Sequence, residues 1–471
     1  MTRRPLIHFT PERNWMNDPN GLVFHKGRYH LYFQYNPNGL GHADMSWGHA
    51  SSADLVTWTE HPVAIEADDV EQIFSGSIVI DHDNSAGFAL PGQAALVAIY
   101  TSARRASDIQ AQALAYSMDD GMTWTKYAAN PVLDRGSRDF RDPKVFRYSG
   151  AAGAYWVMVA VEAADHQVVL YRSDDLRSWT FLSAYGPAGA VGGVWECPDL
   201  FPLALDNDPN DERWVLVISL NPGGIAGGSG TQYVVGQFDG VTFTPDAEPG
   251  AVRHAGLGTL NWLDYGRDCY AGVTFHGLPD GERTLIAWMS NWDYAVALPG
   301  EPWKGAMTTP RHLSLVTRDG RPQLRVEPIL PGGRPAASFV DAETMPLPAA
   351  ARIDLRLHDR VALEFACAGG QRVVVRCAPD EIVLDRSASL SEPQAFPSVE
   401  RMAICGQSQE LTLVIDSTSL EIYAADGLRT LTDLVPWIGD VTLRVMEQRG
   451  LEALNVTDLA VNVELTGTLL E

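Results

Sequence analysis

The stretch Ser173-Asp174-Asp175-Leu176-Arg177-Ser178-Trp179-Thr180 recurs along this chain. Residues 52–59 and 117–125 repeat its Ser, Asp, Trp and Thr, and residues 237–244 form a weaker copy with Phe243 at the Trp position. The aromatic positions 58, 124, 179 and 243 lie 66, 55 and 64 residues apart. A period of roughly 60 residues in a strand-rich chain is typical of β-propeller blades, each of which is a four-stranded sheet.

Short apolar and aromatic runs between Gly, Asn, Asp and Pro turns fill the spaces between these copies, and no long amphipathic helix interrupts them. Such a pattern predicts an all-β fold. The expected strands include residues 29–35, 95–100, 155–161, 214–219 and 285–289. About 320 residues at this period predict a five-bladed propeller. Its inner strands would surround one axial pocket, so residues distant in sequence would meet there.

A Pro/Gly-rich stretch at residues 327–335 follows, which is typical of a linker. The chain then alternates apolar and charged positions, as in antiparallel sheets with one solvated face. The expected strands are residues 352–357, 361–365, 372–376, 410–415, 420–423 and 441–445. We therefore expect a C-terminal β-sandwich. The predicted domains are a catalytic propeller at 1–328, a linker at 329–336 and a sandwich at 337–471.

The composition limits the partners of the protein. The chain has 471 residues and a formal net charge of −24, which argues against nucleic acid or an anionic membrane surface as a partner. A neutral substrate is compatible with this charge. No run of 18 apolar residues suggests a membrane span.

Five scattered cysteines include no C-x-x-C pair, so neither a disulfide framework nor a zinc site is expected. This pattern fits a reducing compartment best. Residues 1–5 contain two arginines but no apolar segment, unlike a signal peptide. The prediction is a cytoplasmic protein, with a trimmed secreted form as the alternative.

Three carboxylates stand in unusual local settings. Asp18 lies within a turn-forming Asn-Asp-Pro-Asn-Gly run, Asp142 lies between Arg141 and a proline, and Glu196 lies between Trp195 and Cys197. Each has a simpler interpretation when taken alone: a hairpin turn, a surface ion pair, or a strand Glu paired with a Lys. Together they belong to successive stretches of the repeat, and a propeller would bring them to its axis.

Glycoside hydrolysis uses two acidic side chains, one ionised as a carboxylate and one protonated as a carboxylic acid. An Arg neighbour favours an ionised carboxylate, whereas apolar surroundings favour the protonated form that a general acid needs. The sequence contains no HExxH, Gly-x-Ser-x-Gly or phosphate-loop motif that would indicate another chemistry. No metal and no cofactor are expected.

The motifs taken together resemble those of glycoside hydrolase family 32, the fructan hydrolases and invertases. The resemblance extends over nearly the whole chain, from residues 15–21 around Asp18 to residues 415–423. The intermediate segments, in family order, are 33–37, 47–50, 74–77, 141–143, 196–198, 264–266, 270–271, 303–307 and 310–311. The family fold, a five-bladed propeller with a β-sandwich, agrees with the repeat.

The resemblance implies a role for each carboxylate. Asp18 would attack the anomeric carbon of a fructosyl unit, Glu196 would protonate the leaving oxygen and then activate water, and Asp142 would stabilise the transition state. The family retains configuration, so the nucleophile and acid/base carboxyl groups are expected roughly 5–5.5 Å apart. The implied substrate-binding residues are Trp15, Asn17, Gln34, Trp47, Phe74, Ser75, Arg141, Asp264 and Trp292.

The expected activity is that of a retaining exo-β-fructosidase acting on levan- or inulin-type fructans and fructooligosaccharides, with some activity on sucrose. Residues 48–50, 73–77, 221–224 and 228–233 look most like those of levanases and exo-inulinases. A cytoplasmic location favours short imported substrates instead. A sucrose-preferring invertase, a fructosyltransferase and a non-catalytic sugar-binding propeller remain as alternatives. The sandwich either braces the propeller or helps to form a homodimer.

Overall fold

Strands make up nearly all of the regular structure. The computed structural model describes residues 3–150, 153–279, 281–298, 300, 302–338, 344–389, 397–404, 409–435 and 437–460. Within these ranges the only helix is the short 3-10 helix η1 (Leu257–Thr259), which cannot reach across a membrane. The predicted all-β fold is confirmed.

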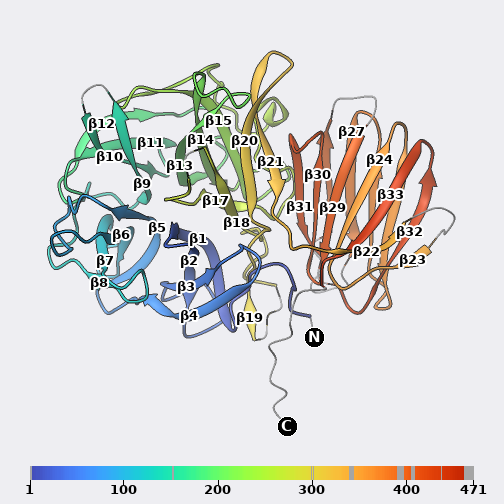
Figure 1. Ribbon diagram of the computed structural model, residues 1–471, viewed down its shortest axis with the longest axis horizontal. Coiled ribbons are helices and arrows are strands. Elements are labelled where there is room, and N and C mark those ends of the chain that lie inside the picture. The colour runs from blue at the N-terminus through green and yellow to red at the C-terminus, as the bar shows by residue number, and fades with distance from the viewer. Residues whose placement is uncertain are drawn as a thin grey trace, which may run out of the picture.

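Five sheets form the N-terminal part (Figure 1). The first contains β1 (Asn14–His25), β2 (Arg28–Asn36), β3 (Ser46–Ser52), β4 (Trp58–Ile65) and β19 (Trp303–Lys304). The second contains β5 (Glu71–Asp81), β6 (Ala95–Arg104), β7 (Gln110–Ser117) and β8 (Thr125–Lys126). The third contains β9 (Phe140–Gly150), β10 (Gly153–Glu162), β11 (Gln167–Ser173) and β12 (Thr180–Tyr185). The fourth contains β13 (Val194–Ala204), β14 (Glu212–Asn221), β15 (Gly230–Phe238) and β16 (Phe243–Pro245), and the fifth contains β17 (Tyr270–Thr274), β18 (Thr284–Trp288), β20 (Arg311–Arg318) and β21 (Arg321–Pro328).

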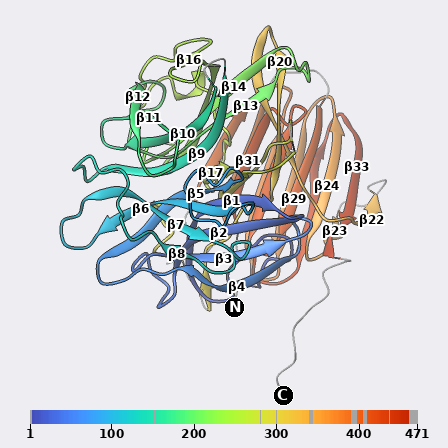
Figure 2. The same ribbon diagram turned by 60° about the vertical axis from the view of Figure 1, so that its left-hand side comes forward.

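The five sheets close into a ring. Their first strands contact one another in the order β1, β5, β9, β13, β17, and β17 contacts β1 again. The labels of these five inner strands surround one centre in Figure 1, and those of β1, β5, β9 and β17 also lie close together in Figure 2. The propeller is further closed by β19, which pairs in parallel with β1 although the two strands lie far apart in the chain. The predicted five-bladed propeller is confirmed.

The repeated stretch forms the turn between the third and fourth strand of a blade. In the third blade, the Asp175 carboxylate accepts hydrogen bonds from the backbone N–H groups of Arg177 and Ser178, and the Trp179 indole donates to the Leu176 carbonyl at 3.0 Å. Trp58 and Trp124 make the equivalent indole bonds in the first two blades. The repeat therefore encodes a local hydrogen-bonded turn.

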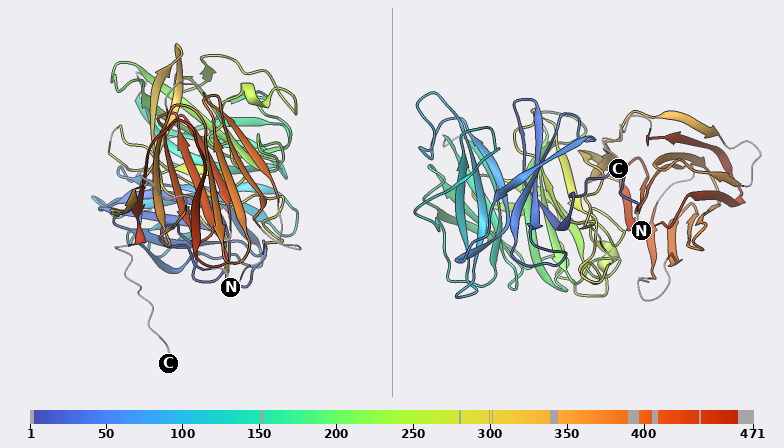
Figure 3. Two further views of the ribbon diagram at one scale, coloured as in Figure 1. Left: turned by 90° about the vertical axis from the view of Figure 1, so that its right-hand side faces the viewer. Right: turned by 90° about the horizontal axis from the view of Figure 1, so that it is seen from below.

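Two six-stranded sheets pack face to face as the C-terminal sandwich, beside the propeller (Figure 3). One sheet contains β22 (Arg334–Ser338), β33 (Leu451–Asp458), β24 (Ala351–Leu357), β29 (Gln409–Asp416), β30 (Ser419–Ala424) and β31 (Arg429–Leu434). The other contains β23 (Thr344–Pro346), β32 (Val441–Gln448), β25 (Val361–Cys367), β26 (Arg372–Cys377), β27 (Glu381–Ala388) and β28 (Val399–Ala403). The domain limits expected from the sequence stay a prediction, since strand ends alone do not define an independently folding unit.

A buried charge network joins the two parts. Arg311 of β20 is fully buried and donates to Asp264 at 2.9 Å, to Glu421 of the sandwich at 3.0 Å and to the Thr432 hydroxyl at 2.6 Å. Burial alone would raise the pKa of Glu421, but Arg311 and His8 outweigh it and hold that pKa well below its usual range. Residues 415–423, expected to be a sandwich signature, thus supply groups that dock the sandwich onto the propeller.

Replacing Arg311 with Met is expected to lower the free energy of unfolding by about 3–5 kcal/mol, because the buried Asp264 loses its counterion and the buried Glu421 keeps only His8. Thermal unfolding would report this as a marked fall in melting temperature. Arg318→Met, on an exposed position of the same strand, is the control and should change little. An Arg311→Met protein as stable as the parent would show that the network does not hold the two parts together.

Candidate active site

Each of the five inner strands carries a β-bulge, a point where two residues face a single residue on the neighbouring strand. The bulged pairs are Asn17-Asp18, Phe74-Ser75, Asp142-Pro143, Cys197-Pro198 and Ala271-Gly272. A bulge bends its strand and redirects the side chains that it carries. Five bulges around one ring therefore turn the inner strands toward a common space at the propeller axis.

Three of the bulged residues adopt a left-handed backbone conformation. Asp142, Cys197 and Ala271 have φ angles of 62°, 47° and 54°. Such angles cost residues other than glycine about 1–3 kcal/mol and persist only where the surrounding structure enforces them. Here the closed ring of blades supplies that enforcement, and the strained positions coincide with the candidate site.

The three predicted carboxylates meet around Cys197. Its backbone N–H donates to Oδ2 of Asp142 at 2.9 Å, and its Sγ lies 3.6 Å from Oδ2 of Asp18 and 3.7 Å from Oδ2 of Asp142. Glu196 directly precedes it on β13. Three strands that begin at positions 14, 140 and 194 thus bring one carboxylate each to a single place.

Asp18 is held on both carboxylate oxygens. The Ser75 hydroxyl donates to Oδ2 at 2.8 Å, and the Asn17 amide donates to Oδ1 at 3.1 Å. The Asn17 amide oxygen in turn accepts a hydrogen bond from the Trp15 indole at 2.8 Å. This chain of contacts fixes the orientation of the Asp18 carboxylate.

Glu196 is held by an arginine and a tyrosine. Arg141 Nε lies 3.2 Å from Oε1 of Glu196, and the Tyr270 hydroxyl donates to Oε2. Arg141 Nε also lies 3.9 Å from Oδ2 of Asp142, so one guanidinium is the counterion of two carboxylates. Contrary to the apolar setting suggested by its sequence neighbours, Glu196 therefore lies among polar groups, and its side chain keeps 23% of its surface exposed.

Burial raises the pKa of Asp18 to about 6, with a second contribution from the negative charge of Glu196. Burial also raises the pKa of Asp142, although Arg141 opposes that increase. The carboxylates interact closely enough to titrate as one system, so the extra proton belongs to the cluster rather than to one residue. The cluster therefore ionises at higher pH than isolated carboxylates would.

The Asp142→Asn variant is expected to be more stable than the parent at pH 8, by about 1–3 kcal/mol, and little changed near pH 4. A carboxyl group whose folded pKa is raised disfavours folding once it ionises, so stability falls as pH rises from the unfolded pKa through the folded one. The amide removes that ionisation and its oxygen still accepts from Cys197. Melting temperatures at the two pH values test this, and an equal change at both would contradict it.

Two other predicted residues form hydrogen bonds to the backbone at the bulge of the second blade. Gln34 donates to the Ile73 carbonyl at 3.0 Å, and the buried Trp47 indole donates to the Phe74 carbonyl at 3.0 Å. Both therefore support the bulge that presents Ser75 to Asp18. Whether they also contact substrate stays a prediction.

The last two predicted residues differ in their positions. The Trp292 ring stacks on Trp15 at a centroid distance of 6.0 Å, beside the Asn17–Asp18 bulge. Asp264 is only 3% exposed, and its carboxylate accepts hydrogen bonds from Arg311 and Thr432 in the network that joins the propeller to the sandwich. The structure does not bring Asp264 together with the three carboxylates.

Sequence reasoning missed three residues near the site. Tyr270 is the residue before the fifth bulge, the position that Glu196 occupies in the fourth blade. Thr101 accepts from the Asp142 backbone N–H at 2.8 Å, and the His42 ring lies 5.2 Å from the Trp292 ring. Tyr270 belongs to the segment 270–271 that resembles the family, which is the signal that could have found it, but no sequence signal marks the other two.

Comparison with known proteins points to one family. The family model described as "Glycosyl hydrolases family 32 N-terminal domain" matches residues 8–328. An extracellular exo-inulinase from Aspergillus awamori is 39% identical over 91% of this chain and 88% of its own length. A levanase from Bacillus subtilis is 49% identical over a region that covers 66% of this chain and 45% of the levanase. The crystal structure of the Aspergillus awamori exo-inulinase has a TM-score of 0.89 at 36% identity and 98% coverage of both chains.

The cytoplasmic location expected from the sequence is wrong, because exo-inulinases that match 91% of the chain are named extracellular. The scattered cysteines suggest a reducing compartment, but their burial offers another explanation for why they are unpaired. Cys197, Cys269 and Cys377 are unpaired and buried, so they are shielded from the redox state of their surroundings. Cys405 lies outside the described residues. Unpaired cysteines of this kind do not report a compartment.

Proposed function

Because the chain belongs to glycoside hydrolase family 32, we propose that it is a retaining exo-β-fructosidase acting on levan- or inulin-type fructans and fructooligosaccharides, with some activity on sucrose. The chain is accordingly a glycoside hydrolase that acts on β-fructosides. One observation carries the proposal: Asp18, Asp142 and Glu196 converge on Cys197 from three different blades. A pair of carboxyl groups in one pocket is the equipment of glycoside hydrolysis, which supports the proposal.

In this proposal Asp18 is the nucleophile. Ser75 and Asn17 hold its two oxygens, so the carboxylate is oriented before substrate arrives. Such pre-organisation lowers the entropic cost of reaching the attacking geometry. Asp18 would attack the anomeric carbon and form a covalent fructosyl intermediate.

Glu196 is the proposed acid/base residue. In the first step it delivers a proton to the leaving oxygen, and in the second it accepts a proton from the attacking water. Tyr270 and Arg141 each hold one of its oxygens, so the carboxyl group stays in one orientation through both steps.

Asp142 is the proposed transition-state stabiliser. Its carboxylate is fixed by the Cys197 N–H and lies near Arg141, and its negative charge favours the positive charge that develops on the fructosyl ring. The expected separation of roughly 5–5.5 Å between the Asp18 and Glu196 carboxyl groups stays a prediction.

Aromatic residues beside the carboxylates suit a neutral sugar chain. Trp292 stacks on Trp15, and His42 contacts both Trp292 and Phe74, with a ring distance of 6.3 Å to the latter. Rings at this place offer apolar faces to the sugar next to the scissile bond. The exo-inulinase and levanase relatives take their names from fructans, which supports fructans as the substrates.

Product release from sucrose, inulin and levan, each at equal fructosyl concentration, tests the proposal. We expect fructose as the only early product from both fructans, released faster than from sucrose. Early oligosaccharides would contradict exo action, and strong activity on sucrose alone would indicate an invertase. Growth of longer oligosaccharides at high sucrose would indicate fructosyl transfer. The Asp18→Asn protein is the blank for contaminating activity.

A further inference from the structure

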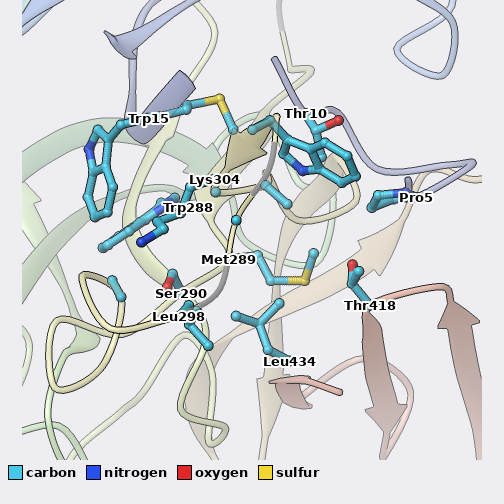
Figure 4. Close-up of a pocket in the computed structure, with 16 residues that line it drawn as sticks. Pro5, Thr10, Trp15, Trp288, Met289, Ser290, Leu298, Lys304, Thr418 and Leu434 are labelled. Carbon is cyan, nitrogen blue, oxygen red and sulfur yellow. The ribbon is translucent and has the colours of Figure 1, made fainter. Parts of the chain in front are cut away.

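A second cavity lies between the propeller and the sandwich, behind the carboxylate site. Its volume is about 490 Å³, within the range of small-molecule sites. In Figure 4, Trp15, Trp288 and Lys304 of the propeller lie at one end, and Thr418 and Leu434 of the sandwich lie at the other. None of the three catalytic candidates lines it.

Two buried polar groups of residues that line this cavity lack a partner among the described residues, the Trp288 indole nitrogen and the Thr418 hydroxyl. Trp288 is only 1% exposed, and its indole nitrogen has no hydrogen-bond partner among the described residues. A Cβ built on Gly305, which also lines the cavity, would lie 3.4 Å from that nitrogen. The same Cβ would lie 2.2 Å from the Met16 carbonyl oxygen, so only glycine fits at position 305. A buried donor without a partner costs stability unless a bound molecule or water satisfies it.

The charge of the cavity wall has one sign. Lys304 is the only charged residue among the described residues that line it. Its ammonium lies 5.9 Å from the Trp15 ring and donates to the Val296 carbonyl at 2.8 Å, which leaves two of its three donors. Lys304 and Trp288 lie at the same end of the cavity in Figure 4.

The remaining wall is mostly apolar and aromatic, with Met289, Leu298 and Trp303 among its residues. The described lining contains no Asp, Glu, Asn or Gln, the side chains that would hold several sugar hydroxyls. A fructosyl chain would therefore leave most of its hydroxyls unpaired here. A cation would meet Lys304 without any compensating carboxylate.

We propose that this interdomain cavity binds a small aromatic monocarboxylate. The aromatic ring lies against the apolar wall, and the carboxylate accepts hydrogen bonds from the Lys304 ammonium and the Trp288 N–H. Charge-assisted hydrogen bonds of this kind are roughly twice as strong as those between neutral groups. The occupant would thus differ in chemistry from the neutral sugar at the carboxylates.

Calorimetric titration of the full chain with 2-naphthoate, and with its uncharged isostere 2-naphthamide, tests the proposal. We expect one molecule of 2-naphthoate to bind, at least about 10-fold more tightly than the amide. Lys304→Gln should remove most of this preference, whereas Lys26→Gln, at an exposed lysine on the first hairpin, should not. Saturating fructose should leave 2-naphthoate affinity little changed, because Trp15 is the one predicted substrate-binding residue among the described residues that line the cavity.

Leu434→Trp fills the cavity from the sandwich side and should abolish binding of both compounds. Its melting temperature and sucrose hydrolysis verify that the variant is folded. The proposal is overturned if 2-naphthoate does not bind, if it binds no better than the amide, or if fructose displaces it. Unchanged affinity in a folded Leu434→Trp protein would place the ligand elsewhere and would equally refute it.

Discussion

Replacing Asp18 with Asn is expected to lower the turnover of sucrose by at least about 10⁴-fold, because an amide cannot form the covalent fructosyl intermediate. The change is nearly isosteric, and the Ser75 hydroxyl and the Asn17 amide stay in place around it. The loss should therefore appear in kcat, with the fold retained.

The measurement is fructose release under saturating sucrose, with the melting temperature as the test of folding. Asp83→Asn is a matched control, because Asp83 is a surface carboxylate with 76% of its side chain exposed. The Asp18→Asn variant should still bind fructose in calorimetric titration. Turnover within about tenfold of the parent would refute the assignment of Asp18 as nucleophile.

Replacing Glu196 with Gln should lower turnover of sucrose by about 10³–10⁴-fold, because neither proton transfer has a donor or acceptor. A substrate whose leaving group needs no proton, such as β-fructofuranosyl fluoride, should retain a fast first step. The intermediate would then accumulate, and azide, which needs no general base, should restore turnover. Equal losses with sucrose and the fluoride, with no effect of azide, would argue against an acid/base role.

The Glu196→Gln variant should also change the pH dependence of the first step. In the parent, activity should rise with pH through about 6 as Asp18 ionises, since burial and then the charge of Glu196 raise its pKa. The substitution removes the negative charge of Glu196 but leaves Asp18 buried. The low-pH side of the activity profile, measured with the fluoride, should therefore move part of the way toward lower pH. A low-pH side that stays in place would mean that burial alone sets the pKa of Asp18.

The turns of the propeller show why much of this fold could be predicted from the sequence. Asp175 bonds to backbone groups two and three residues away, and Trp179 bonds to a carbonyl three residues back. Such contacts need no distant partner, so the same short pattern appears wherever the turn is built. The motifs around Asp18, Asp142 and Glu196 are equally local, and their resemblance to a known family rests on short runs of neighbouring residues.

Asp264 and Tyr270 show where local patterns are insufficient. Both belong to segments that resemble the family, yet Asp264 is bound to Arg311, 47 residues further along the chain, while Tyr270 donates to Glu196, 74 residues earlier. The role of each residue depends on which charged side chain from a distant part of the sequence lies next to it in the folded chain. Composition around either residue carries no information on that choice.

The sequence alone determined the all-β class, the five blades, the sandwich and the three converging carboxylates, because turn chemistry, strand alternation and short motifs are properties of neighbouring residues. Only the tertiary structure decided the five aligned bulges, the partners of the buried charges and the cavity between the two parts. These features arise from strand register and from contacts between segments far apart in sequence, such as Arg311 with Glu421, 110 residues later. Their energies depend on burial, which exists only once the chain has folded.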